Sequence, residues 1–136
     1  MVIAPRGHPL ARRARLGLPD LTETPRLTRE RGSGTRRATD AFRVEKGIKW
    51  PARMALGSNE AIKHAVAAGL GLAVLSRHTL GPRPEREGLV ELKVAGFPLK
   101  RWWQVVWRRD RTLSRPARAF LDSLHAVPAK RGKRRD

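Results

Sequence analysis

The stretch RMALGSNEAIKHAVAAGLGLAVLS, at residues 53–76, decides the fold. Two short apolar runs, at 54–56 and 72–75, flank a segment whose apolar residues recur with the period of a helix. The inward face of this helix is predicted to comprise Ile62, Ala65, Val66 and Leu70. A strand, a helix and a second strand in this order form a β-α-β unit, so we expect both strands to be parallel and covered on both faces.

The ends of the predicted helix are marked by capping residues. Ser58 is a favourable N-cap, because its hydroxyl can accept a hydrogen bond from a free backbone N–H of the first turn. Glu60 places a negative charge near the positive end of the helix dipole, and Gly69 suits the position at which a helix closes. The helix is therefore predicted to begin just after Ser58 and to close at Gly69.

The residues before this unit contain the same kinds of element. Strands are predicted at 1–4 and 27–29, and a short helix at Pro19, since proline is favourable at a first helical position. A second turn, at 32–35, opens a helix that Gly47 closes. The inward residues of that helix are predicted to be Ala38, Ala41 and Phe42. Strands and helices thus alternate, as they do in α/β proteins.

The residues after the unit are less regular. Residues 78–88 show no period and indicate a loop, whereas residues 89–94 alternate and indicate a strand with one wet face. A further strand is predicted at 101–107, and a last helix is predicted to begin at Ser114. The buried face of that helix is predicted to comprise Ala117, Phe120, Leu121 and Leu124.

Two turns share one design and are candidates for a binding site. The turns at 32–35 and 57–59 each follow a predicted strand, consist of glycine and small polar residues, and open a helix. At the carboxyl edge of a parallel sheet both helix N-termini can face one crevice, where free N–H groups and the helix dipole favour a carboxylate or phosphate. Arg36 and Arg37 could add charge-assisted contacts. Equally, these residue types are good turn and cap residues without any ligand.

Four motifs, in order along the chain, resemble one protein family. They are HPLA at 8–11, RERGSGTRR at 29–37, the stretch at 53–76, and LSRPARAFLDSL at 113–124. Through them the chain resembles the second half of the effector-binding domain of LysR-type bacterial transcriptional regulators, and most of all the subgroup that controls carbon-fixation operons. Because such regulators begin with a helix-turn-helix domain that this sequence does not contain, the resemblance predicts an N-terminally truncated chain.

The resemblance implies a fold and a domain organisation. The fold is expected to be α/β, a parallel-rich sheet with helices on both faces, forming one lobe of a type II periplasmic-binding-protein-like fold plus part of the other lobe. Residues 1–99 would form the second sub-domain of the effector-binding domain, and residues 100–127 a return strand and helix that belong to the first sub-domain. Residues 128–136 are basic and without period, and are predicted to form a disordered tail.

The resemblance also implies a function. Family members bind small, often anionic, metabolites between two sub-domains, so the chain is expected to be the effector-binding portion of a regulator and not an enzyme. Carried over position by position, the expected effector-binding residues are Ser33, Gly34, Thr35, Arg36, Ser58 and Asn59. Arg37 is left out of this set, because its position one helical step further on suits contact with solvent as well as contact with a ligand. Intact members form homo-oligomers that hold promoter DNA through the N-terminal domain, and a single lobe should bind its effector weakly.

A net charge of +18 at pH 7 raises an alternative, a small basic nucleic-acid-binding protein. Arginine supplies 23 of the 30 basic residues, and residues 54–99 carry only 5 basic against 4 acidic side chains. The charge therefore lies on the flanks, where a compositional bias of the genome accounts for it as well as a polyanionic partner does. The flanking Trp102, Trp103 and Trp107 could stack on single-stranded bases, or could be core residues that lack their partner sub-domain.

Other function classes find little support in the sequence. The chain has no cysteine, which excludes disulfides and thiolate metal sites, and its four histidines do not stand at ligand spacing. It contains no nucleophile elbow, zinc-protease motif or P-loop, so no cofactor and no metal are expected. No window has the length and apolarity of a transmembrane helix, and the N-terminus lacks a secretory signal. The chain is therefore predicted to be cytoplasmic, without a membrane partner.

Overall fold

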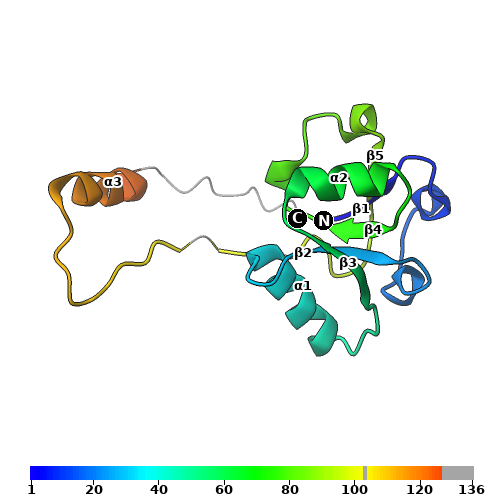
Figure 1. Ribbon diagram of the computed structural model, residues 1–136, viewed down its shortest axis with the longest axis horizontal. Helices are drawn as coiled ribbons and strands as arrows, with labels where there is room; N and C mark the ends of the chain where they lie inside the picture. The colour runs from blue at the N-terminus through cyan, green and yellow to red at the C-terminus, as the bar shows by residue number, and fades with distance from the viewer. Residues whose placement is uncertain (103, 127–136) are drawn as a thin grey trace, which may run out of the picture. The chain divides into compact units, whose positions relative to one another are not determined.

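A computed structural model describes residues 1–102 and 104–126. They fall into two compact units, Met1–Arg101 and the described part of Trp102–Asp136. The first unit contains the β-sheet and the two helices that flank it (Figure 1). Trp103 and the predicted tail at 128–136 lie outside the described residues. No helix in the described part of the chain is both long enough and apolar enough to cross a membrane.

Five strands of the described chain form one sheet in the order β3-β2-β4-β1-β5. Their bounds are Val2–Pro5 for β1, Arg26–Arg29 for β2, Ala52–Leu56 for β3, Leu72–Val74 for β4 and Leu89–Leu92 for β5. The β3-β2 and β2-β4 pairs are parallel, whereas β1 is antiparallel to both β4 and β5. Among these described strands, β1 thus runs in the opposite direction to the other four. The prediction of a parallel-rich α/β fold is confirmed.

Two helices cover opposite faces of this sheet (Figure 1). Helix α1, Gly34–Glu45, follows β2, and helix α2, Asn59–Ala67, follows β3. The cap predicted for α2 is present, since Ser58 Oγ accepts a hydrogen bond from Ala61 N at 3.0 Å. The C-terminal end of α2 is closed by Gly69, whose φ of 81° is a left-handed conformation that glycine adopts without strain.

The connections contain short 3-10 helices. Those of the described residues are Pro9–Arg12, Pro19–Leu21, Arg77–Thr79 and Pro84–Glu87. The second confirms the short helix predicted at Pro19, and the last two lie in the segment predicted to be a loop. In the second unit, helix α3, Arg115–Ala126, begins directly after Ser114, as predicted.

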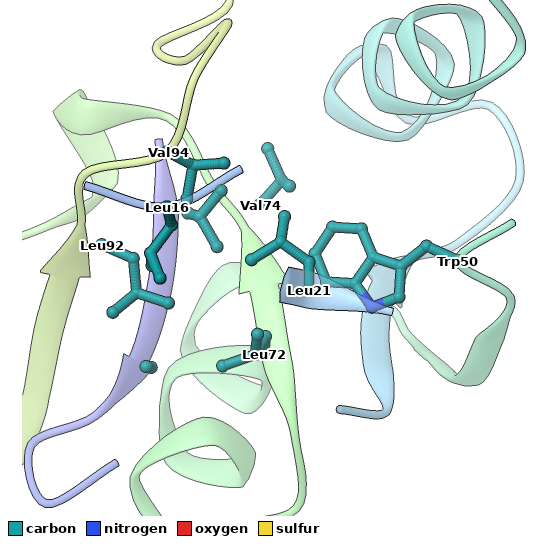
Figure 2. Packing of buried hydrophobic residues seen from close by; sticks show 9 residues of the cluster. Leu16, Leu21, Trp50, Leu72, Val74, Leu92 and Val94 are labelled. Carbon is teal, nitrogen blue, oxygen red and sulfur yellow. The ribbon is translucent and has the colours of Figure 1, made fainter. Parts of the chain in front are cut away.

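The hydrophobic core has one part on each face of the sheet. Alternate residues of β1 divide between the two parts, because successive side chains of a strand point to opposite faces. The first cluster comprises Val2, Ala4, Leu16, Leu21, Trp50, Leu72, Val74, Leu92 and Val94, and Figure 2 shows Leu21 and Trp50 packed beside β4. The second cluster comprises Met1, Ile3, Leu27, Ile62, Val66, Ala73, Leu75 and Leu89, and includes the buried face of α2. Each fully buried aliphatic side chain contributes about 1.5–3 kcal/mol to this core.

The prediction that both strands of the β-α-β unit are covered is wrong for β3. Strand β4 is buried along its whole length, but β3 lies at the edge of the sheet, and its Met54 is 40% exposed. The two strands are parallel, as predicted, yet β2 lies between them. An apolar run indicates a strand without indicating its place in the sheet, and that place decides its burial.

Two predicted helix faces are partly wrong. Ile62 and Val66 of α2 are fully buried, but Leu70 is exposed because the helix ends before it. On α1 the predicted Ala41 is exposed, and Thr39 is buried instead. Thr39 tolerates burial because its hydroxyl donates to the carbonyl of the residue four positions earlier at 2.9 Å.

The strand predicted at 101–107 is absent from the described residues of that segment. A strand needs a neighbour to satisfy its backbone hydrogen bonds, and no described strand pairs with this segment. Its Trp102 is 93% exposed. Helix α3 buries Leu121 as predicted, but Phe120 and Leu124 are exposed, since no described element of the second unit covers them.

The α-amino group of Met1 lies in the sheet, where it donates to Leu75 O at 2.9 Å. Burial lowers the pKa of this group below the usual value of 8.0. The unfolded chain therefore binds the proton more readily, so the free energy of unfolding should rise with pH from the lowered pKa up to about 8. Urea unfolding across this pH range should show the rise, and acetylation of the amine should abolish it. The same rise in the acetylated chain would contradict this assignment.

Candidate functional site

The two turns singled out in the sequence lie side by side. Strands β2 and β3 are parallel neighbours, with Arg29 in register with Leu56. At their carboxyl ends, Glu30 N donates to Leu56 O at 3.1 Å. The helices that follow, α1 and α2, thus begin at the same edge of the sheet. This edge carries the predicted binding residues Ser33, Gly34, Thr35, Arg36, Ser58 and Asn59.

The N-terminus of α1 is open. Ser33 precedes the helix, but its hydroxyl makes no capping hydrogen bond. The first helical hydrogen bond runs from Arg37 N to Ser33 O at 3.0 Å, so the N–H groups of residues 34–36 have no carbonyl partner in the described chain. Free N–H groups at the positive end of a helix dipole favour a bound anion.

Arg101 brings a guanidinium to this helix end. A Cβ built on Gly34 would lie 2.8 Å from Arg101 Nη1, so the guanidinium rests against the glycine. Among the described residues, Arg101 takes part in none of the ion pairs. A guanidinium and the positive end of a helix repel each other, whereas an anion between them is attracted by both.

The N-terminus of α2 is more fully occupied. Ser58 Oγ accepts the capping hydrogen bond from Ala61 N. Asn59 Oδ1 accepts a hydrogen bond from Arg29 Nη1, and Gly57 O accepts one from Arg29 Nη2 at 3.4 Å. The hydroxyl proton of Ser58 and the amide protons of Asn59 remain as donors. Capping without a ligand therefore accounts for Ser58, but it does not account for Ser33.

Arg36 folds back onto the protein. Its Nη1 donates to Arg29 O at 3.1 Å, and its Nε donates to Asp40 Oδ2 at 3.4 Å. These contacts fix the guanidinium near the start of α1 and use part of its donor set. Arg37 is exposed, in keeping with its omission from the predicted site.

Sequence reasoning missed two arginines at this edge, Arg29 and Arg101. Arg29 donates through Nε and Nη2 to both carboxylate oxygens of Glu30, at 2.7 and 2.9 Å. These hydrogen bonds lower the pKa of Glu30. The position of Arg29 at the head of the RERGSGTRR motif was a signal, but its contact with a residue 30 positions later was not visible in the sequence.

A partly buried ion cluster joins α1 to β2. Arg26 is 3% exposed and donates to Trp50 O at 3.0 Å and to Asp40 Oδ1 at 3.1 Å. Its guanidinium carbon lies 5.8 Å from the centroid of the Trp50 ring, within the range of a cation-π contact. The Asp40 carboxylate also lies 3.4 Å from Arg36 Nε and 3.6 Å from Arg43 Nε, so it forms ion pairs with three arginines. Burial lowers the pKa of Arg26.

Two other kinds of site fit the structure less well. Within 1–102 and 104–126, no three histidine, aspartate or glutamate side chains gather as metal ligands. A groove of about 280 Å³ is lined by Thr22, Glu23, Thr24, Pro25, Trp50, Pro51, Ala52 and Arg53. It lies at the amino ends of β2 and β3, where neither α1 nor α2 begins, so neither helix dipole favours an anion there.

Known bacterial regulators resemble this chain. It is 46% identical over 130 residues to a RuBisCO operon transcriptional regulator of Allochromatium vinosum. This match covers 96% of this chain and 43% of the regulator. It is 41% identical over 126 residues to the HTH-type transcriptional activator CmpR of Synechocystis sp.. This match covers 93% of this chain and 41% of the activator. The chain therefore spans less than half the length of these relatives.

A solved structure agrees with the sequence relatives. The regulatory domain of Synechocystis PCC6803 CcmR, in complex with 2-PG, matches this chain with a TM-score of 0.85 at 41% identity, over 96% of this chain and 62% of that domain. Similarity to RuBisCO operon regulators confirms the predicted resemblance to the carbon-fixation subgroup, and none of these relatives supports the nucleic-acid-binding alternative. Residues 1–129 match the family described as the LysR substrate binding domain. The chain belongs to the LysR substrate-binding domain family.

Proposed function

We propose that this chain is the effector-binding portion of a LysR-type transcriptional regulator, and that it binds a small anionic metabolite at the carboxyl edge of β2 and β3. The observation that carries the proposal is the open N-terminus of α1, where Ser33 is uncapped and Arg101 rests against Gly34. Because the relative solved with 2-PG matches nearly the whole chain, 2-PG is the first ligand to test.

The proposed site combines donors from both turns. It comprises Ser33, Gly34, Thr35, Arg36, Ser58 and Asn59, to which we add Arg101. The free N–H groups of α1 would hold one anionic group, and the two arginines would balance its charge. This arrangement orients an anionic ligand and neutralises its charge, which supports a binding function.

The remaining parts of the proposal concern the whole regulator. Residues 1–99 would be the second sub-domain and residues 100–127 a contribution to the first sub-domain, while the tail at 128–136 lies outside the described residues. Homo-oligomer formation and contact with promoter DNA, in the cytoplasm, would be properties of the intact regulator. Because one lobe cannot enclose a ligand, the affinity of this chain for its effector should be weak.

Replacing Ser33 by aspartate should stabilise the chain and abolish anion binding. Aspartate is a good N-cap and its charge suits the helix dipole, so the free energy of unfolding should rise by about 0.5–1 kcal/mol. The same carboxylate occupies the place proposed for the ligand, so the affinity for 2-PG should fall by at least about tenfold, equivalent to about 1.4 kcal/mol. Calorimetric or NMR titration, combined with urea unfolding, measures both effects.

The matched control is Ser33→Asn, which supplies a cap without a charge. It should raise stability in the same direction and, because it adds no negative charge, should lower the affinity for 2-PG by less than Ser33→Asp does. Undiminished binding of 2-PG by Ser33→Asp would show that the anion does not sit at the N-terminus of α1. Absence of 2-PG and phosphate binding by the wild-type chain would remove the proposed function.

A further inference from the structure

Arg29 joins the two turns of the proposed site. It is the last residue of β2, and its side chain is 18% exposed. From there the guanidinium reaches the turn before α2, where Nη1 donates to Asn59 Oδ1 and Nη2 donates to Gly57 O. The same guanidinium donates two hydrogen bonds to Glu30 in the turn before α1. One side chain thus contacts both turns.

The contact with Arg29 fixes the orientation of the Asn59 amide. A guanidinium has donors and no acceptor, so Asn59 must turn its oxygen toward Arg29 and its NH₂ group away. In the described part of the chain, Asn59 Nδ2 has no hydrogen-bond acceptor. Asn59, the first residue of α2, therefore presents two N–H donors beside a helix N-terminus, which is the chemistry that suits an anion.

The effect of Glu30 on the site also depends on Arg29. Glu30 lies in the turn that leads to α1, and its carbonyl accepts a hydrogen bond from Ser33 N at 3.3 Å. Without a partner, its carboxylate would be attracted to the same helix N-terminus as the ligand and would repel an anion there. Bidentate pairing with Arg29 holds the carboxylate in place and offsets its charge.

We infer that Arg29 is a positioning residue that makes this edge of the sheet selective for anions, by turning the Asn59 donors outward and by neutralising Glu30. The inference rests on the proposed function and deepens it, because it names the residue that sets the charge preference of the site. Arg29 acts through its two neighbours, so the ligand need not touch it.

Replacing Arg29 by glutamine should lower the affinity for 2-PG by about tenfold or more. The double variant Arg29→Gln/Glu30→Gln should recover part of that loss, since the unpaired carboxylate is then absent. A merely structural role of Arg29 would give no such recovery. The matched control is Arg31→Gln, which removes an equal charge two positions away. Arg31 is exposed and forms no ion pair among the described residues. Its affinity should stay within about twofold of the wild type.

A readout without ligand separates this inference from the proposed function. In NMR spectra of the free chain, the side-chain NH₂ group of Asn59 should have a fixed orientation in the wild type and in Arg31→Gln, and should lose it in Arg29→Gln. If the wild type binds neither 2-PG nor phosphate while this signature depends on Arg29, the positioning of Asn59 is supported and the proposed function is wrong. If Arg29→Gln equals Arg31→Gln in both affinity and NH₂ signature, the inference is overturned.

Discussion

Replacing Gly71 by alanine is expected to destabilise the protein by about 3 kcal/mol or more. Gly71 directly precedes β4, and a Cβ at this position would lie 2.3 Å from Pro25 O. That oxygen is backbone and cannot rotate away. It also accepts the hydrogen bond from Leu72 N at 2.9 Å, so relief of the clash requires β2 and β4 to separate where their pairing begins. Alanine should therefore loosen the middle of the sheet and both parts of the core.

Urea unfolding of Gly71→Ala and of the wild type measures this effect. The control is Gly7→Ala, because a Cβ built on Gly7 meets no atom within 4 Å. We expect Gly7→Ala to change the free energy of unfolding by less than about 0.5 kcal/mol. If Gly71→Ala unfolded at the same urea concentration as the wild type, the close approach of Gly71 to Pro25 would be contradicted.

Replacing Asp40 by alanine is expected to cost about 2–4 kcal/mol. The substitution leaves Arg26 almost fully buried without its carboxylate. It also leaves the positive charges of Arg36 and Arg43 beside Arg26 without their common carboxylate. Removal of one partner from a buried ion pair is costly, because the remaining charge stays out of water. Asp40 is itself 36% exposed, so water can reach part of the cluster and the loss should fall below that of a fully buried pair.

A second variant tests this cause. Arg26→Met/Asp40→Ala removes the buried charge together with its partner, so the double variant should be more stable than Asp40→Ala alone. Thermal unfolding of both variants and of Arg26→Met completes the cycle. Equal losses in the single Asp40 variant and in the double variant would show that the cost comes from lost packing and not from the orphaned charge of Arg26.

The fold could be predicted wherever its causes lie within a few residues. The cap at Ser58 and the closure at Gly69 are local signals, and the structure contains both of them. Strand order is different, because it depends on pairing between distant segments. The apolar residues of β3 are compatible with an interior strand, yet β3 pairs with β2 and lies at the edge.

The juxtaposition of the two turns that make up the candidate site could be predicted for a geometric reason, since neighbouring parallel strands end at the same edge. The difference between its two turns could not. Ser33 and Ser58 occupy equivalent positions in the sequence, but Ser58 caps its helix and Ser33 does not. Arg29 and Arg101 also escaped prediction, because each gains its role from a residue far along the chain, Asn59 and Gly34 respectively.

The reversed strand β1 determines when this protein can fold during its synthesis. The partners of Val2 across the sheet are Val74 and Leu92, which follow it by 72 and 90 positions in the sequence. Strand β1 therefore cannot be paired on both sides until residue 92 has been translated and released. Contacts of such long range make folding slow and leave the nascent strand exposed to other chains. The first unit therefore cannot complete its sheet until β5 has been synthesised.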